Sequence, residues 1–402
     1  MSSMARELWP DRWFGDRARQ RLAVLREVDP WLVLCTVALL LCGLVFIGSA
    51  TQDDAQFGNQ QGRQALFVVC GAGISFFLLL VPYARLMRGA WLLYFATVVA
   101  LLGLPFFAPV INGARRWYSL PGFSIQPSEF AKLAVVLALA ALLRFKSRAR
   151  TVEGLFVPML VAAVPALLIL RQPDLGSALV FAPVLLAMCF VAGAPPRSVL
   201  LVVLVALGVG VIAYFTSLHG YQKERIDVWL KHWTWTDELI KADEGVRDLI
   251  LNKGYQSWQA LIAMGGGGLT GFGIGSGPQN RYDFLPYRSE DYVFAVVGEE
   301  TGWLGCVLVL GLMFALVIGI LGIAARTRER FGRLVCVGVA TWLGMQSLVH
   351  VAVCAWLVPA TGLPMPALSY GGSSTMATLL GIVVCLNIGA RREPVLAGDG
   401  FR

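Results

Sequence analysis

The sequence predicts an all-α integral membrane protein with ten transmembrane helices and a long extracytoplasmic loop between helices 7 and 8. The first observation is composition: 57% of the 402 residues are apolar and 14% are charged, whereas a soluble domain is about half apolar and about a quarter charged. The second is that the apolar runs are about twenty residues long, the length that a helix needs to cross a bilayer. A barrel strand would need about ten residues of alternating hydrophobicity.

The predicted membrane domain occupies residues 30–393, between cytoplasmic tails at 1–29 and 394–402. Its ten expected spans cover residues 31–50, 65–83, 90–110, 128–143, 155–170, 177–194, 198–216, 303–324, 334–358 and 372–390. The interval 217–302 is the one long polar segment. We expect it to form an extracytoplasmic loop that contains short helices.

The net charge of +8 is distributed as a topology signal and not as a stripe that binds nucleic acid. If the N-terminus is inside, 20 of the 33 Lys and Arg residues fall in the tails and short loops on that side. Because short loops rich in Lys and Arg stay in the cytoplasm, we expect a multi-pass protein of the cytoplasmic (inner) membrane with both termini cytoplasmic. Its expected partners include membrane lipids and no nucleic acid.

The cysteines and histidines predict neither disulfides nor a zinc site. All eight cysteines fall in apolar runs without a CxxC spacing, and the three histidines are scattered. The unusual polar motifs lie instead in or beside four outer pieces of the chain, residues 111–126, 171–176, 217–302 and 359–374.

Two charged pairs accompany the first outer piece. Arg115 and Arg116, followed by Trp117, either anchor the chain at the membrane interface or clamp a phosphate, which the fork of guanidinium donors suits. Glu129 and Lys132 lie three residues apart on one face of the next expected helix, so they form a structural ion pair or part of a ligand site. A charge at the centre of a span costs about 2.5–3.5 kcal/mol. Near the outer end, where Glu129 and Lys132 are expected, the cost is smaller and the two can pair.

Polar residues in the other outer pieces have two interpretations each. Asp174, in the short loop RQPDLG, either shapes a tight turn or faces a ligand. Gln256 and Gln259 lie three residues apart on an amphipathic turn, ahead of a glycine-rich strip where a long ligand can pass or the chain can bend. Ser373 and Ser374 either cap the last helix or mark a helix N-terminus whose amides face an anion.

Asp291 is the candidate general base. It stands between the polar pair Ser289-Glu290 and the apolar run 292–297, where a loop enters a lipid-facing helix and a carboxylate is costly to keep. We expect Ser289 to cap a helix that begins near Glu290, with Asp291 in the first turn, where the helix dipole favours the ionised form. A partly apolar surround would then raise its basicity.

These segments together resemble the SEDS family of cell-wall proteins, named for shape, elongation, division and sporulation. The resemblance rests on NGARRW with QPSEFAKL, QPDLG, YQ with Gln259, FLP ahead of Asp291, GEE, and GLPMPALSYGGSS, in this order along nearly the whole chain. Members are peptidoglycan glycosyltransferases that polymerise lipid II with a class B penicillin-binding protein as transpeptidase partner. The resemblance implies that Asp291 is the family's essential aspartate. The segments VDPW, YQKERI and FGRL favour the RodA type, and hence the elongation machinery over the division machinery.

The resemblance and the charges imply an inverting glycosyl transfer at the outer membrane face. Asp291 would take the proton of an acceptor hydroxyl, while the cationic groups, with a divalent cation (Mg or Mn), would stabilise the departing pyrophosphate. These cationic groups are Arg115, Arg116 and Lys132. Two alternatives stay open. One is a flippase for a lipid-linked precursor, which needs a polar path across the bilayer. The other is a non-catalytic scaffold for a class B penicillin-binding protein, which has no need of Asp291.

Overall fold

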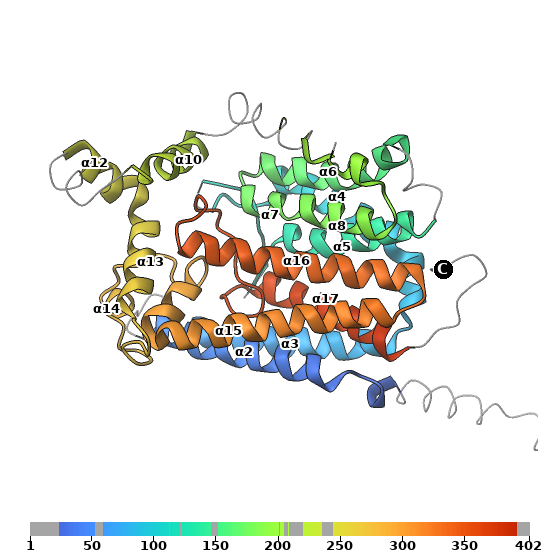
Figure 1. The fold of residues 1–402 in the computed structure, drawn as a ribbon, viewed down its shortest axis with the longest axis horizontal. Coiled ribbons are helices and arrows are strands. Elements are labelled where there is room, and N and C mark those ends of the chain that lie inside the picture. The colour runs from blue at the N-terminus through green and yellow to red at the C-terminus, as the bar shows by residue number, and fades with distance from the viewer. Residues whose placement is uncertain are drawn as a thin grey trace, which may run out of the picture.

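The computed structural model describes residues 24–52, 59–111, 113–120, 123–145, 152–200, 202–204, 208, 220–234 and 244–391. Long helices lie side by side in one bundle, and shorter helices of the long loop gather at one end of it (Figure 1). The elements are η2 (Val24–Arg26), α2 (Pro30–Ala50), α3 (Gln60–Leu80), α4 (Tyr83–Phe107), β1 (Tyr118–Leu120), β2 (Phe123–Ile125), α5 (Pro127–Leu143), α6 (Val152–Arg171), α7 (Leu175–Leu179), α8 (Phe181–Val191), α10 (Gly220–His232), α12 (Glu244–Leu249), η3 (Ile250–Gly254), α13 (Tyr255–Gly266), α14 (Pro278–Arg281), α15 (Val293–Arg326), α16 (Arg330–Cys354) and α17 (Gly372–Ala390).

Within the described residues, 7 helices are long and apolar enough to cross a membrane: α2, α3, α4, α6, α15, α16 and α17. The apolar stretch Leu175–Val191, formed by α7 and α8, is shorter. Together with α5, these helices match nine of the expected spans in position. The expected span 198–216 lies largely outside the described residues, as does most of the tail 1–29, so the total of ten spans stays a prediction. The helical, membrane-spanning character of the chain is confirmed.

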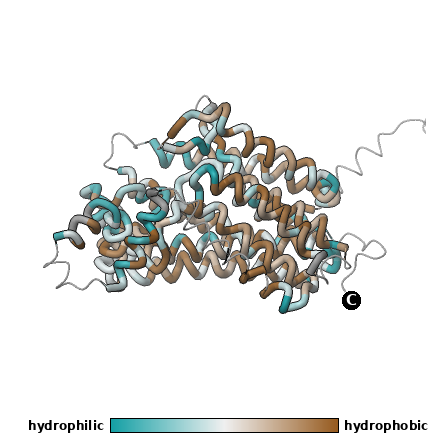
Figure 2. Tube along the Cα trace, turned by 90° about the horizontal axis from the view of Figure 1, so that it is seen from above, coloured by the Kyte–Doolittle hydropathy of each residue, from teal (hydrophilic) through white to brown (hydrophobic). Residues whose placement is uncertain are grey.

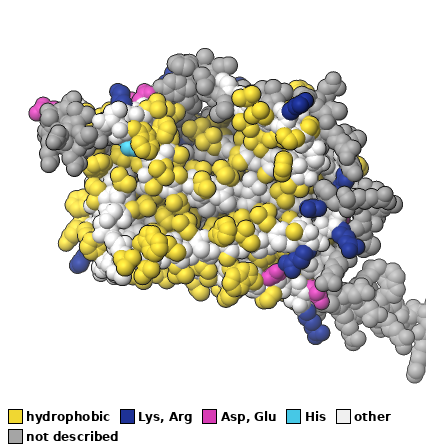
Figure 3. Space-filling view, in the orientation of Figure 1, with side chains coloured by type: hydrophobic (Ala, Val, Ile, Leu, Met, Phe, Trp, Pro, Cys, Tyr) yellow, Lys and Arg dark blue, Asp and Glu magenta, His cyan; other side chains and the backbone are white. Residues whose placement is uncertain are grey.

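The hydropathy of the bundle agrees with this character. Apolar residues run along the bundle helices, and polar residues gather toward the end where the long loop lies (Figure 2). On the face shown in Figure 3, hydrophobic side chains cover much of the bundle, while several Lys and Arg side chains gather at the end opposite α13. Basic residues at one end and a wide apolar band are the pattern that a bilayer selects.

Helix α5 forms the centre of the bundle and carries two charges into it. It packs against α4, α6, α8, α16 and α17, and nearly every residue along it is buried. A helix that is apolar all round is stable only when other helices surround it. Glu129 and Lys132 lie in its first two turns and are 1% and 2% exposed, so the start of α5 brings both charges to the edge of the core.

Helix α15 is broken near its start. Gly302 has φ 64° and ψ −159°, so α15 consists of two helical pieces joined at a kink. The glycine-rich strip of the long loop pairs with the backbone at this break. Phe272 N–H donates to Glu299 O at 3.0 Å, and Trp303 N–H donates to Gly268 O at 2.9 Å. Backbone groups released by a broken helix need such partners when water is excluded.

Two buried carboxylates strengthen the same junction. Glu299 accepts from the backbone N–H groups of Gln279, at 2.6 Å, and Asn280, at 3.1 Å. Glu300 Oε1 accepts from Asn280 Nδ2 at 2.7 Å and from the Ser49 hydroxyl. The carboxylates therefore tie the long loop, the broken helix and the end of α2 into one unit.

We predict that Gly302→Ala destabilises the protein. A Cβ at this position would lie 2.5 Å from Gly271 N and would meet a backbone conformation with φ +64°, a region that is essentially restricted to glycine and costs other residues about 1–3 kcal/mol. The melting temperature of the purified variant in detergent should fall clearly. Gly311→Ala in the same helix is the matched control, because no atom lies within 4 Å of its added Cβ. Equal melting temperatures for the two variants would contradict the prediction.

Candidate active site

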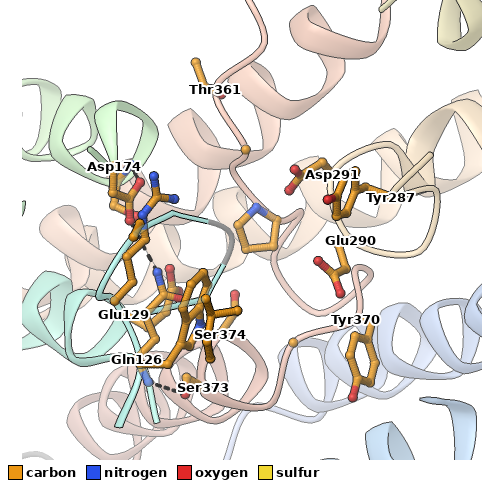
Figure 4. Close-up of a pocket in the computed structure, with 18 of the residues that line it drawn as sticks. Gln126, Glu129, Asp174, Tyr287, Glu290, Asp291, Thr361, Tyr370, Ser373 and Ser374 are labelled. Atoms are coloured by element: carbon orange, nitrogen blue, oxygen red, sulfur yellow. Dashed lines mark hydrogen bonds between the residues drawn. The ribbon is translucent and has the colours of Figure 1, made fainter. Parts of the chain in front are cut away.

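A cavity of about 950 Å³ opens at the end of the bundle where the long loop lies. Its walls come from the start of α3, the β1–β2 hairpin, α5, α7, α10, α13, the turn before α15, and the loop between α16 and α17. Side chains from these separate segments converge on it (Figure 4). The lining includes most of the site residues expected from the sequence: Arg116, Glu129, Asp174, Gln256, Asp291, Ser373 and Ser374.

Asp291 lies in a turn before α15 and not in its first helical turn. The helix begins at Val293 after the N-cap Tyr292, which makes no side-chain cap. Ser289, expected as the cap, donates instead to Gln60 Oε1 at 2.8 Å. The expected cap and helix start were therefore wrong. The backbone shows why: the N–H groups of Glu290 and Asp291 both donate to Tyr287 O, at 3.1 and 3.0 Å, which closes a turn where a helix was expected.

The surroundings of Asp291 favour its use as a base. Burial raises its pKa to about 6, an effect that Asp174 adds to and that Arg225 and Arg116 oppose. Burial, followed by the negative charge of Asp291, raises the pKa of the neighbouring Glu290 to about 7. A carboxylate with a pKa near 6 is still mostly ionised at neutral pH and is a stronger base than an exposed aspartate. Burial is the main cause of the raised pKa, in agreement with the partly apolar surround expected from the sequence.

Arginines from three segments line the cavity. The side chain of Arg116 donates from Nε to Gln172 O at 2.8 Å and from a terminal nitrogen to Pro173 O. Arg225, on α10, donates to Ala360 O at 3.0 Å. Arg63, near the start of α3, lines the same space. These guanidinium groups can bind an anionic ligand, and they share the cavity with the carboxylates of Glu129, Asp174, Glu290 and Asp291.

Arg63 and Arg225 are site residues that sequence reasoning missed. Arg225 lies in the YQKERI segment, which contributed to the family resemblance but was not assigned to the site. Arg63 lies just ahead of an apolar run. The signal that could have identified Arg63 is a single charge beside an expected span, and the same kind of signal had singled out Lys132.

A chain of hydrogen bonds along the cavity joins three of the four polar pieces defined above, residues 111–126, 171–176 and 359–374. Asp174 caps α7 by accepting from Ser177 N–H at 3.1 Å, and it also accepts from Gln126 Nε2 at 3.3 Å. The N–H of Gln126 donates to Ser373 Oγ at 2.9 Å, and Ser373 donates to Ser124 O at 3.3 Å. Asp174 thus shapes its turn and faces the cavity at the same time.

The N-terminus of α17 also reaches this wall. The helix begins at Gly372 with Gly371 as its N-cap, so Ser373 and Ser374 occupy the first turn and do not cap it as one interpretation expected. Gly371, Gly372, Ser373 and Ser374 all line the cavity. The first turn of a helix has N–H groups without intrahelical partners and a positive dipole end, which together suit an anion.

Three expected site residues lie outside the cavity lining. Lys132 is 2% exposed, and its Nζ lies 2.7 Å from Glu129 Oε1 and 2.9 Å from Gln346 Oε1. Arg115 is exposed and donates to Pro105 O. Gln259 lies on α13 behind the wall. Glu129 itself lines the cavity, and its buried Oε2 has no hydrogen-bond partner among the residues that the structure describes. Lys132 is therefore connected to the cavity only indirectly, by its ion pair with Glu129.

Comparison with known proteins identifies similar chains along nearly the whole length. The model of the FtsW, RodA and SpoVE family, described as "Cell cycle protein", matches residues 30–393. A protein of Coxiella burnetii, named "Probable peptidoglycan glycosyltransferase FtsW", is 33% identical over 380 residues, which cover 91% of this chain and 97% of the relative. A relative of the same name from Aeromonas salmonicida is 34% identical over 370 residues, which cover 90% of each chain.

Solved structures agree with these relatives. One chain, from a structure described as "Structural coordination of polymerization and crosslinking by a peptidoglycan synthase complex", aligns with a TM-score of 0.73 at 32% identity and covers 91% of this chain and 99% of its own length. The crystal structure of the rod shape determining protein RodA of Thermus thermophilus aligns with a TM-score of 0.64 at 29% identity, covering 90% of this chain and 96% of its own length.

Proposed function

Since the chain belongs to the FtsW, RodA and SpoVE family of cell cycle proteins, we infer that it is a peptidoglycan glycosyltransferase, the activity in the names of its relatives. Asp291 is the observation that carries the inference: a carboxylate with a pKa raised to about 6 lines a cavity that also contains arginines. We propose lipid II as the substrate and a glycan strand as the product. The prenyl tails would stay in the bilayer beside the cavity.

The proposed reaction is a direct displacement at the anomeric carbon of the donor sugar. Asp291 takes the proton of the acceptor hydroxyl, and the electron pair of that oxygen forms the new bond to the anomeric carbon. The bond from this carbon to the pyrophosphate oxygen breaks on the opposite face, and its electron pair leaves with the polyprenyl pyrophosphate. The configuration is inverted, and the proton on Asp291 passes to water. A positioned base contributes about 10²–10⁴ to such a rate.

We assign the leaving pyrophosphate to the arginine-rich part of the cavity. Arg116 supplies a guanidinium fixed by two backbone carbonyls, and fixed positive charge stabilises charge that develops in the transition state. The first turn of α17, which includes Ser373 and Ser374, lines the same cavity. Lys132 would act indirectly, through its ion pair with Glu129, because Glu129 lines the cavity and Lys132 does not. Gln256 lines the cavity and is available to a sugar or peptide group.

We also propose that a divalent cation, Mg or Mn, binds at the carboxylates of this wall. No group of three His, Cys, Asp or Glu side chains that could hold a metal exists among the described residues. Mg²⁺, however, is commonly held by one or two carboxylates together with substrate phosphates. Glu129, with its unpartnered buried Oε2, and Asp174 would supply them. The cation would neutralise pyrophosphate charge. Polymer yield that is unchanged by EDTA would exclude this role.

We propose a class B penicillin-binding protein as the partner, supported by the similarity to a chain of a peptidoglycan synthase complex. The place in elongation stays a prediction, since the similar proteins include both FtsW proteins and a RodA structure. We also propose that the cavity faces outward and both termini face the cytoplasm of the cell. Tyr282→Cys should then react with an impermeant thiol reagent in intact cells, and Arg328→Cys only after permeabilisation.

Replacing Asp291 by Asn should abolish polymerisation. The amide keeps the shape of the side chain and cannot accept the proton, so we expect the rate to fall by at least about 10²–10⁴. Labelled lipid II, purified protein and gel separation of the glycan products give the measurement. An unchanged melting temperature is the control for folding. Near-normal polymer from a well-folded Asp291→Asn protein would remove Asp291 from the base role and leave the proposed reaction without one.

The rate should rise with pH through about 6 and level off above it. The base works in its ionised form, and the pKa of Asp291 is raised to about 6 by burial and Asp174 against the opposing effects of Arg225 and Arg116. The profile of kcat/KM for lipid II between about pH 5 and 8 gives the measurement. Because Glu290 also titrates, with a pKa of about 7, Glu290→Gln serves to assign the limb: it should retain a limb near 6. Loss of that limb in Glu290→Gln would assign it to Glu290 instead.

Arg116→Ala should weaken transfer strongly, and Arg116→Lys should restore only part of it. Lysine keeps the charge but lacks the planar fork that binds a carbonyl and a phosphate together. Donor binding and single-turnover rates of the purified variants separate affinity from chemistry. Arg115→Ala is the matched control, because Arg115 lies outside the cavity lining. Equal effects of the two alanine variants would contradict the placement of the pyrophosphate at Arg116.

A further inference from the structure

The loop 359–364, between α16 and α17, lies against the Asp291 carboxylate and forms one wall of the cavity around it. Its residues Pro359 to Gly362 and Pro364 line the cavity. Gly362 has φ +69°, and a Cβ on it would lie 3.5 Å from Asp291 Oδ2 and 3.9 Å from Oδ1. Figure 4 shows the loop that carries Thr361 passing beside the Asp291 side chain. The position of this loop therefore decides how much space, and how much water, the carboxylate meets.

Two buried side chains of α16 hold this loop. Gln346 and His350 lie four residues apart on α16, hence on one face, and are 0% and 1% exposed. Gln346 Nε2 donates to Pro364 O at 2.7 Å. His350 Nδ1 lies 2.7 Å from Leu363 O, and it must be the donor because a carbonyl oxygen only accepts. Two successive carbonyls of the loop are thus fixed to one helix.

The amide of Gln346 also connects the loop to the ion pair of α5. Its Oε1 accepts from Lys132 Nζ at 2.9 Å and from Trp342 Nε1 at 2.8 Å. Lys132 in turn binds Glu129 at 2.7 Å. Only an amide satisfies all three bonds of position 346, since the carbonyl end accepts from two donors and the nitrogen end donates to the loop. A continuous set of contacts runs from Glu129 through this glutamine to the loop over Asp291.

The opposite side of the loop is fixed as well. Arg225 donates to Ala360 O at 3.0 Å. A Cβ on Gly176, at the start of α7, would lie 2.7 Å from Thr361 O, so α7 packs directly against the loop backbone. The loop has little room to move in either direction while these contacts hold.

We propose that Gln346 and His350 are positioning residues, which hold loop 359–364 against Asp291 and so set the surroundings of the general base. The inference rests on the proposed function. Neither side chain lines the cavity, so neither touches the substrate. Their loss should act through Asp291: a loosened loop admits water, which lowers the pKa of a carboxylate that burial had raised. Asp174, Arg116 and Glu290 face Asp291 from other elements, and Arg225 faces it while bonded to Ala360 O of the loop.

The test compares His350→Leu with His350→Asn in the lipid II assay. The Asn amide nitrogen occupies nearly the place of the histidine Nδ1 and can donate to Leu363 O, whereas Leu cannot. We expect His350→Leu to lower kcat at pH 7 by about tenfold to a hundredfold, the range that a displacement of about 1 Å produces. The acid limb of its pH–rate profile should move about one pH unit lower, toward the pKa of an ordinary aspartate. His350→Asn should restore most of the rate and the limb.

Gln346→Met is the second variant and should show the same loss and the same shift of the limb. Ser347→Ala is the matched control, because among the described residues the buried Ser347 hydroxyl donates to Leu343 O of its own helix, at 2.8 Å. A rate loss in both loop variants with an unmoved acid limb, or no rescue by Asn, would overturn the inference. Wild-type polymerisation and an inactive Asp291→Asn protein in the same assay establish the proposed function separately, so the two failures are distinguishable.

Discussion

The ion pair between Glu129 and Lys132 is the interaction on which the outer half of the structure depends. Both side chains are buried, and removing one partner of such a pair costs about 3–5 kcal/mol because a buried charge is left alone. A pair of apolar residues would pack as well at lower cost, so stability alone does not explain it. The pair sits where α5 meets the cavity, presents a carboxylate to it, and fixes Gln346 from behind. It therefore links the core of the bundle to the wall of the site.

The sequence predicted the spans well and the ends of the helices poorly. A run of about twenty apolar residues can be recognised as a span from the sequence alone, because the thickness of the bilayer determines its length. The start of α15 does not: whether Ser289 caps a helix depends on Gln60, more than two hundred residues away, which takes its hydroxyl. The break at Gly302 likewise depends on the pairing of the glycine-rich strip with residues 299–304, which no local pattern shows.

The site was predicted where single residues stood out against their surroundings. Asp291, Asp174 and Glu129 were charges beside apolar runs, and the structure places them around one cavity. Arg225 was missed because its neighbours on α10 look like those of any interfacial helix. Gln346 and His350 gave no signal of a site, since an uncharged polar residue within a span usually bonds inside the bundle, as both do.

The break in α15 also bears on where Asp291 lies relative to the part of this helix that can span a bilayer. A straight helix of 34 residues would be about 51 Å long at about 1.5 Å per residue, far more than the hydrocarbon thickness of about 30 Å. The kink divides this length: residues 303–326 are enough to cross the membrane, and the piece before Gly302 turns aside with the long loop. Asp291, two residues ahead of that piece, therefore lies outside the stretch that is long enough to span, and the proposed reaction would take place at the level of the headgroups. A pyrophosphate whose tails remain among the lipids, as in the proposed substrate, would reach that level without being lifted from the membrane.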